Sequence, residues 1–220
     1  MNITNDIISA YLGNFYVNDN NKLMELRAFA ESRYVPIIQK DTEGLLRALL
    51  KLKKPAMVLE IGTAVGYSSC VFADCCGCHV TTIEADEEMA AAADMNIKEL
   101  GFGDKIRLLR GDARSVLREL AEPDLRKYDF VFIDAAKSHY REFWDLIIPL
   151  VKEDGIIVCD NILMKGMTAS DEFDTKKRYR TSIRKMREFV QYISTLDYAE
   201  TTILPVGDGV SISLLNLQGR

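Results

Sequence analysis

Short apolar runs of strand length alternate with helical patterns from residue 55 onward. The strand-like runs cover 57–61, 79–84, 106–110, 130–134 and 156–160, and the helical patterns between them cover 68–74, 87–100, 113–120 and 140–151. Nearly continuous apolar strands that alternate with helices are typical of a parallel sheet covered on both faces. The pattern therefore predicts an α/β fold with helices on either side of the sheet.

The alternation changes after the fifth strand. Residues 181–196 have a helical pattern, and two strand-like stretches follow at 199–205 and 210–215, joined through the turn at 207–209. A turn of this kind makes the two stretches a hairpin, so we expect the last strand to run antiparallel to its neighbour.

The first fifty residues are helical in pattern. One apolar face of this segment carries Leu45, Leu46, Leu49 and Leu50. We expect these helices to form a lid or a dimerisation layer on the sheet. The prediction is a single domain over 1–220, with a helical extension over 1–54 and a Rossmann-like core over 55–220.

The composition narrows the class of protein. The chain of 220 residues has a formal net charge of −5, which argues against a protein that coats nucleic acid indiscriminately. No apolar stretch approaches the roughly 20 residues of a membrane span. The first residues have no basic segment followed by an apolar run, so we expect no secretory signal.

Four of the five cysteines are crowded between residues 70 and 78. The run CCGC at 75–78 could suggest a metal site, but no second pair of Cys or His follows at the spacing of a zinc finger. We interpret these side chains as ordinary reduced thiols at a helix end and in a turn. Reduced thiols favour a cytoplasmic location.

A glycine follows the first predicted strand, at the edge where open parallel sheets bind ligands. In the stretch EIGTAVGYSS, Gly62 lets the backbone approach a ligand, and the next helix begins with free amide groups. Ala64 stands where a dinucleotide fingerprint has its middle glycine, so the loop does not match that fingerprint.

Carboxylates end the next two strands. Glu84 could accept both ribose hydroxyls of a nucleotide-like ligand, or it could be a solvated acid in an acidic turn. Asp112 could serve an adenine edge or simply cap the following helix, and the two roles are compatible.

Polar side chains also end the fourth and fifth strands, as Asp134 and as Asp160-Asn161. Adjacent parallel strands lie about 4.8 Å apart, so these side chains can converge. Two carboxylates and an amide oxygen suit Mg²⁺, although each could also be a turn acid or a helix cap. A cation beside Lys137 would depress the pKa of that amine, which could then take a proton from a bound hydroxyl. Alternatively, Lys137 faces solvent.

Five stretches occur in order along the chain, LEIGTAVGYSS, TIEAD, GDA, FVFIDAAKSHY and VCDN. Together they resemble the cation-dependent class I O-methyltransferases, which include the catechol and caffeoyl-CoA enzymes, and the resemblance covers nearly the whole chain. Within that family, AFAESRYVPIIQK, DNILMKGMTA, ILPVGDGVSIS and the basic run at 176–187 are similar to the bacterial tRNA 5-hydroxyuridine methyltransferases.

The resemblance implies a sheet of seven strands in the order 3-2-1-4-5-7-6 with the seventh antiparallel, usually in a homodimer. It implies Mg²⁺ or another divalent cation at Asp134, Asp160 and Asn161, and Lys137 as general base. It implies S-adenosylmethionine as cofactor, in contact with Ile38, Glu60, Gly62, Ser68, Glu84, Asp112, Ala113 and Asp134.

Two classes of acceptor fit such a site. A catechol presents two adjacent oxygens to a cation, and 5-hydroxyuridine presents its hydroxyl beside O4 in the same way. The run KKRYRTSIRKMR at 176–187 has seven cations and no anion. It is either a solvated helix face or a surface for a tRNA backbone, on which Tyr179 could stack a splayed base. We expect methylation of the wobble 5-hydroxyuridine of tRNA to 5-methoxyuridine, with small catechol-like or polyphenol acceptors as the alternative.

Two other classes of protein fit the sequence less well. A non-catalytic binding module on this fold predicts lost metal ligands or a broken cofactor loop, and the sequence has neither. A nicotinamide-dependent oxidoreductase is disfavoured by Ala64 and by the polar ends of the fourth and fifth strands.

Overall fold

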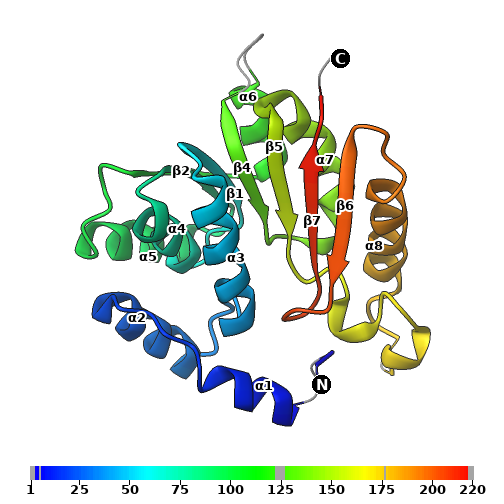
Figure 1. Ribbon diagram of the computed structural model, residues 1–220, viewed down its shortest axis with the longest axis horizontal. Helices are drawn as coiled ribbons and strands as arrows, with labels where there is room; N and C mark the ends of the chain where they lie inside the picture. The colour runs from blue at the N-terminus through cyan, green and yellow to red at the C-terminus, as the bar shows by residue number, and fades with distance from the viewer. Residues whose placement is uncertain (1–2, 5, 122–126, 176, 218–220) are drawn as a thin grey trace.

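A seven-stranded sheet forms the middle layer of the computed structural model, which describes residues 3–4, 6–121, 127–175 and 177–217 (Figure 1). The strands are β1 (Met57–Ile61), β2 (His79–Glu84), β3 (Ile106–Arg110), β4 (Tyr128–Ile133), β5 (Val151–Cys159), β6 (Ala199–Leu204) and β7 (Val210–Leu215). Their order is β3-β2-β1-β4-β5-β7-β6, and β7 runs antiparallel to both β5 and β6. The order and the antiparallel hairpin confirm the predicted fold class.

Helices flank the sheet. They are α1 (Asp6–Gly13), α2 (Asn21–Ser32), α3 (Lys40–Lys53), α4 (Tyr67–Cys76), α5 (Glu87–Glu99), α6 (Ala113–Leu120), α7 (Tyr140–Ile147) and α8 (Arg180–Ile193), with 3₁₀ turns η1 (Lys137–His139), η2 (Ile148–Leu150), η3 (Met164–Gly166) and η4 (Asp171–Phe173). Among the described residues, no helix has both the length and the apolar character that crossing a membrane requires.

Several element boundaries differ from the prediction. Helix α7 ends at Ile147, because Pro149 has no N–H to continue the helical hydrogen bonds, and the 3₁₀ turn η2 follows. Strand β5 therefore starts at Val151, where it pairs with Tyr128 of β4 before a register shift. Strands β4 and β5 both begin earlier in the chain than the apolar runs predicted.

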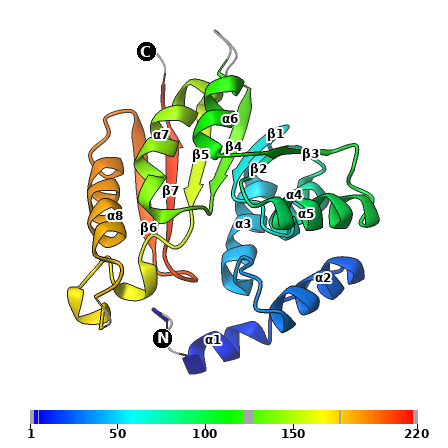
Figure 2. The ribbon, with the colours of Figure 1, turned by 180° about the vertical axis from the view of Figure 1, so that it is seen from behind.

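Side chains of each inner strand alternate between two hydrophobic cores. Leu59 and Ile61 of β1 point to the face covered by α6, α7 and α8, which lies nearer the viewer in Figure 2. Val58 points to the opposite face, which α3, α4 and α5 cover over β1, β2 and β3. Burial on both faces is the physical reason for the nearly continuous apolar strands.

A buried ion pair attaches the N-terminal helices to the rest of the chain. Arg27 of α2 donates to Glu43 of α3 at 2.7 Å, to the carbonyl oxygen of Ile38 at 2.9 Å and to the hydroxyl of Tyr67 at 3.0 Å. Glu43 also accepts hydrogen bonds from Tyr67 and Tyr16, each at 2.8 Å. Figure 1 shows α1 and α2 lying beyond the carboxyl ends of the parallel strands. The pair thus fixes α2 and Ile38 over the edge of the sheet where ligands bind.

We expect Arg27→Ala to lower the free energy of unfolding by about 3–5 kcal/mol, because it leaves the buried Glu43 carboxylate with only the more distant Arg47, at 3.8 Å, as a charged partner. Urea unfolding measures the change. Arg184→Ala is the matched control, since it breaks only the exposed pair with Glu188 and should cost about 0.5 kcal/mol or less. Equal losses in the two variants would contradict the structural role of the buried pair.

Candidate active site

A cleft of about 970 Å³ lies at the carboxyl ends of the parallel strands. It collects predicted site residues from distant parts of the chain, namely Ile38, Gly62, Ser68, Glu84, Asp112, Ala113, Asp134, Lys137, Asp160 and Asn161. Glu60 alone among the predicted residues does not line the cleft and is fully buried beneath it. The structure therefore brings the predicted set together around one cavity.

The loop after β1 requires glycine. Gly62 has φ 97°, and a Cβ there would collide with the carbonyl oxygen of Asp134 at the end of β4. Glu84 at the end of β2 holds this loop, because its Oε2 accepts hydrogen bonds from the backbone N–H groups of Thr63 at 3.1 Å and Ala64 at 2.8 Å. Glu84 is thus more than a solvated acid, and a ribose contact stays a prediction.

Glu60 is a fully buried carboxylate beneath the cleft. Its Oε2 accepts hydrogen bonds from the hydroxyls of Ser69 and Thr82. Its Oε1 lacks a well-formed hydrogen bond to any residue in the described part of the chain. Burial raises the pKa of Glu60 to about 7, although the hydroxyls of Ser68, Ser69 and Thr82 act in the opposite direction.

Asp112 is the N-cap of α6, as one of the two sequence interpretations held. Its carboxylate accepts from the backbone N–H groups of Arg114 at 3.1 Å and Ser115 at 3.3 Å, and it pairs with the Arg114 guanidinium at 3.0 Å. This guanidinium contact, more than the cap, lowers the pKa of Asp112. Because Asp112 also lines the cleft, the cap leaves its second role open.

Lys137 is the centre of a polar cluster at the ends of β4 and β5. Its Nζ donates to Asp134 Oδ1 at 2.7 Å, to Asn161 Oδ1 at 2.8 Å and to the hydroxyl of Tyr140 at 2.9 Å. Asp134 and Asn161 thus meet at one ammonium, and the cation predicted at these strand ends stays a prediction. Asn161 has φ 55°, a left-handed conformation that asparagine tolerates better than most residues.

Asp160 is nearly inaccessible to solvent below this cluster, with 2% of its surface exposed. Its Oδ1 accepts a hydrogen bond from the backbone N–H of Asn161 at 2.6 Å. Burial, and then the charge of Asp134, raise the pKa of Asp160 to about 7. The loop that follows β5 therefore begins with a buried carboxylate whose negative charge is poorly compensated by its neighbours.

A depressed pKa of Lys137 is expected beside a bound cation, and it stays a prediction. In the structure itself, burial lowers this pKa, but the hydroxyl of Tyr140 and the carboxylate of Asp134, which both accept hydrogen bonds from Lys137, raise it well above its usual range. Lys137 is therefore held as an ammonium ion between a carboxylate and an amide oxygen. It does not simply face solvent.

The sequence prediction missed two members of this cluster. Asp208, in the turn between β6 and β7, lines the cleft and accepts from the backbone N–H of Lys165, and burial raises its pKa. Tyr140 donates to the carbonyl oxygen of Asp160 at 2.9 Å while it accepts from Lys137. The available signal for Tyr140 was its position three residues after Lys137, whereas the sequence around Asp208 looked like that of an ordinary turn.

The donor set fits a hard divalent cation. Within the described residues, no three His, Cys, Asp or Glu side chains form a group that could hold a metal ion, so the candidate set needs the amide oxygen of Asn161. Asp134, Asp160 and Asp208 supply three carboxylates near two ammonium groups, those of Lys137 and, beside Asp208, Lys165. The oxygen donors and the excess negative charge both suit a cation such as Mg²⁺.

The fold and the cleft define a class I methyltransferase architecture, with a glycine loop after β1 and polar residues at the ends of β4 and β5. A sequence profile described as O-methyltransferase matches residues 14–215. The chain belongs to this O-methyltransferase family, and the predicted enzyme class is confirmed.

Individual relatives agree with this assignment. A caffeoyl-CoA O-methyltransferase of Populus kitakamiensis is 31% identical over 208 residues, which cover 90% of this chain and 87% of the relative. A catechol O-methyltransferase of Niastella koreensis is 28% identical, with 90% of each chain covered. A Staphylococcus aureus structure, provisionally assigned as a caffeoyl-CoA O-methyltransferase, is 32% identical and superposes with a TM-score of 0.88 over 96% of this chain and 100% of the other.

A more distant structure shares the fold. The Podospora anserina methyltransferase PaMTH1, solved with bound SAH, is 24% identical and has a TM-score of 0.85 over 96% of this chain and 94% of its own.

Glu60→Gln should stabilise the protein at high pH but not at low pH. Because burial raises the pKa of Glu60 from 4.5 to about 7, the folded protein keeps a proton that the unfolded chain loses in this range. The free energy of unfolding of the wild type therefore falls as the pH rises through this window, and the penalty is constant above it. The variant should gain up to about 3 kcal/mol relative to the wild type.

Urea unfolding of both proteins at about pH 4 and about pH 8 measures this difference. Glu99→Gln, on an exposed position of α5, is the control and should show no such trend. A difference between Glu60→Gln and wild type that is the same at both pH values would contradict a raised pKa of Glu60.

Proposed function

We propose that this enzyme transfers a methyl group from S-adenosylmethionine to one hydroxyl of a small aromatic acceptor that carries two adjacent oxygens. The observation that carries the proposal is the cluster of Asp134, Lys137 and Asn161 in the same cleft as the glycine loop. Relatives named as caffeoyl-CoA and catechol O-methyltransferases support this class of acceptor. Both names denote substrates with neighbouring oxygens on an aromatic ring.

The residues around the β1 loop suit the methyl donor. The uncompensated Oε1 of Glu60 can accept a hydrogen bond from a ligand amino group, and Gly62 lets the ligand approach the backbone. Ile38 can cover the ligand, because the hydrogen bond from Arg27 to its carbonyl oxygen holds it at the cleft. The proposed contacts are those predicted from the sequence, Ile38, Glu60, Gly62, Ser68, Glu84, Asp112, Ala113 and Asp134.

We also propose that Asp134, Asp160 and Asn161 hold a divalent cation, with Mg²⁺ as the first candidate. When bound, such an ion lowers the pKa of a coordinated hydroxyl. Asp134 and Asn161 already share one cationic partner, the ammonium of Lys137, which supports their ability to face a single positive charge.

Lys137 remains the candidate general base. It can accept a proton only after it loses its own, and its present contacts with Asp134 and Tyr140 oppose that loss. With these two contacts intact, the Lys137 ammonium can instead exchange its third hydrogen bond, now made to Asn161, for one to an acceptor oxygen and stabilise negative charge on it. Tyr140 would hold Lys137 in place for either role.

The basic run offers a second candidate acceptor, 5-hydroxyuridine in tRNA. Tyr179 lines the cleft and is half-exposed, and Lys177, Arg178 and Arg180 beside it are exposed. These groups could contact a nucleic-acid backbone and stack a splayed base.

Other members of the run contact the protein itself. Arg184 pairs with Glu188, and Arg187 donates to the carbonyl oxygens of Met167 and Thr168 and pairs with Asp171. Lys176 lies outside the described residues. The run is thus a weaker argument than its seven cations indicated, and the small acceptor remains our first proposal.

The deciding experiment incubates the enzyme with labelled S-adenosylmethionine and Mg²⁺, and in parallel with catechol, caffeoyl-CoA or tRNA that carries 5-hydroxyuridine. We expect methylated catechol or caffeoyl-CoA by mass spectrometry, and little 5-methoxyuridine. The reverse preference would overturn the first proposal in favour of the second. No transfer to any of the three would contradict both.

Two variants test the site residues in the same assay. Asp160→Asn keeps the shape of the side chain but removes its charge. If a cation is needed, this variant should reduce kcat/KM at least 100-fold, and EDTA added to the wild type should do the same. Asp154→Asn, an exposed carboxylate, is the control and should not change the rate. Lys137→Arg keeps the charge but cannot act as a base, so a loss of about 10²-fold or more supports general-base catalysis.

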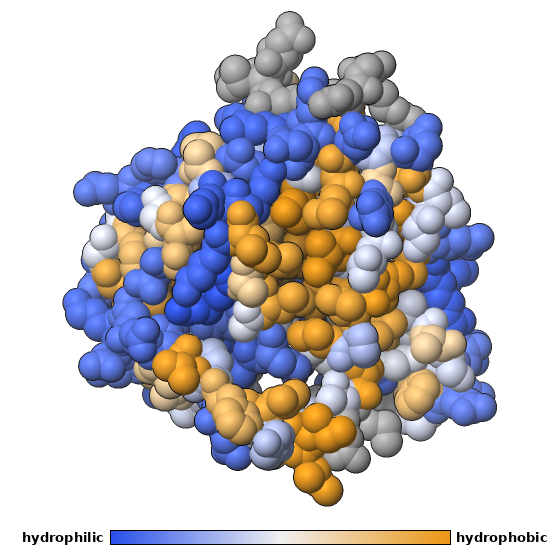
Figure 3. Space-filling model, in the orientation of Figure 1, coloured by the Kyte–Doolittle hydropathy of each residue, from blue (hydrophilic) through white to orange (hydrophobic). Residues whose placement is uncertain are grey.

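We further propose that a second copy of the chain covers an apolar face of the sheet. Figure 3 shows hydrophobic side chains gathered over β5, β7 and β6 beside α3, where no helix covers them. Leu52 of α3 is 81% exposed and Leu214 of β7 is 47% exposed, and Ile156 and Ile212 lie only partly buried nearby. Exposed apolar patches of this kind mark protein–protein contacts.

Light scattering after size-exclusion chromatography tests this assembly. We expect a dimer for the wild type and a monomer for Leu52→Glu or Leu214→Glu, since each places a charge in the proposed interface. Met95→Glu, at an exposed position of α5, should remain dimeric. A wild type that is monomeric at micromolar concentration would exclude the proposal.

A further inference from the structure

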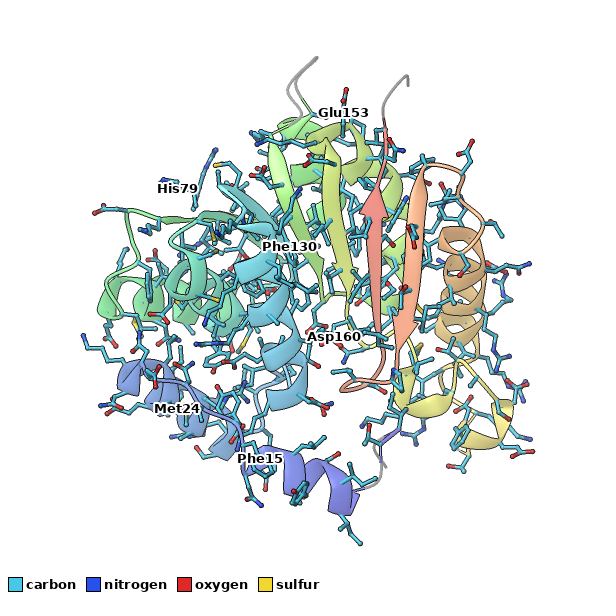
Figure 4. All side chains as sticks on the ribbon, viewed as in Figure 1. Phe15, Met24, His79, Phe130, Glu153 and Asp160 are labelled. Carbon is cyan, nitrogen blue, oxygen red and sulfur yellow. The ribbon has the colours of Figure 1, made fainter. Side chains whose placement is uncertain are left out.

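Three thiols gather at the end of α4, at the end of the sheet that lies opposite the cleft. Helix α4 ends at Cys76, and Gly77 adopts a left-handed conformation (φ 67°) that turns the chain toward β2. Figure 4 places His79, the first residue of β2, at the other end of the sheet from Asp160. None of Cys75, Cys76 and Cys78 lines the cleft, so the methyltransferase site does not account for them.

Two of these thiols approach the same backbone carbonyl group. Sγ of Cys76 and Sγ of Cys78 donate to the carbonyl oxygen of Phe72 at 3.2 and 3.4 Å, which brings the two sulfur atoms close together. With one residue between them, their Cα atoms are at most about 7 Å apart, which is close to the range that a disulfide spans. Cys75 points elsewhere, toward the carbonyl oxygen of Arg47 in α3 at 3.6 Å.

The two thiols differ in accessibility and in charge environment. Cys76 is half-buried, whereas Cys78 is 2% exposed. The neighbouring thiol of Cys78, with a smaller contribution from the charge of Lys105, lowers the pKa of Cys76 despite its burial. The same contact raises the pKa of Cys78. Lys105 is held at this turn by a hydrogen bond of 2.8 Å to the carbonyl oxygen of Gly77.

We propose that Cys76 and Cys78 form a thiol–disulfide exchange site for small disulfides such as glutathione disulfide. The Cys76 thiolate attacks one sulfur of the small disulfide, forms a mixed disulfide and expels one thiolate. Cys78 then loses its proton to solvent or to the expelled thiolate and attacks Sγ of Cys76, which releases the second small thiol. The protein loses two hydrogens and gains one disulfide, and the small disulfide is reduced to two thiols.

The contacts assign different roles to the two sulfurs. An accessible thiolate is the attacking group, because the thiolate and not the thiol is the nucleophile. A buried neighbour whose sulfur contacts the same carbonyl oxygen is suited to the second, intramolecular step. No third ligand among the described residues joins the pair, so a dithiol fits better than a metal site. The proposal is independent of methyl transfer, since its site and its readout are separate from the cleft.

The test treats fully reduced enzyme with glutathione disulfide, quenches the reaction with acid and measures intact mass and peptide maps. We expect the wild type to lose two hydrogens and to carry a Cys76–Cys78 linkage, which a phosphine reductant reverses. Cys78→Ala should stop at a glutathione adduct on Cys76. Cys76→Ser should react at least tenfold more slowly, and Cys75→Ser should behave as the wild type does.

Three results would overturn the proposal. They are a stable adduct on wild-type Cys76 without closure to Cys78, a linkage or adduct centred on Cys75, and a wild-type rate in Cys76→Ser. The buried thiols of Cys70 and Cys159 report on unfolding, because they react only if the chain opens. If Cys70 or Cys159 is modified in the Cys78→Ala variant, the disulfide linkage mapped in the wild type decides whether Cys76 and Cys78 form the exchange site.

Discussion

Taking a charge out of water costs several kcal/mol unless the charge finds a partner, and this chain satisfies that constraint with contacts between distant segments. Arg27 of α2 meets Glu43 of α3 and the hydroxyl of Tyr67 at the start of α4. The N-terminal helices could lie in many places on the sheet, but only one of them pairs these groups. The same contacts fix the carbonyl oxygen of Ile38, and they therefore shape the wall of the cleft.

The candidate active site is the place where the same constraint is only partly met. Glu60 and Asp160 are buried carboxylates whose pKa values are raised to about 7, which means that their ionised forms are poorly compensated. Groups of this kind lower stability, and they are typical of sites that bind a ligand. Lys137 supplies the main positive charge and touches both strand ends. A bound cation and the ligand amino group would complete the compensation that the protein leaves unfinished.

The two faces of the sheet are covered unequally. Helices α6, α7 and α8 pack along one face, whereas α3, α4 and α5 cover only part of the other (Figures 1 and 2). The apolar side chains left beside α3 can be removed from water only by another molecule or another copy of the chain. The thiol pair at the end of α4 does not line the cleft, so the thiols and the candidate active site can be tested separately.

The sequence by itself determined the hairpin and the identity of the strand ends, because apolar period and turn residues are local signals and the carboxyl ends of parallel strands meet at one edge, whereas the sheet order was implied by the resemblance to a known family. Asp134 and Asn161 were predictable for that reason. Only the tertiary structure decided what each polar group contacts. Asp208 reaches the cleft from the last hairpin, Glu84 holds the β1 loop, and Arg187 contacts the chain itself. These contacts depend on how distant segments pack and on which rotamer each side chain adopts there, and no local pattern carries that information.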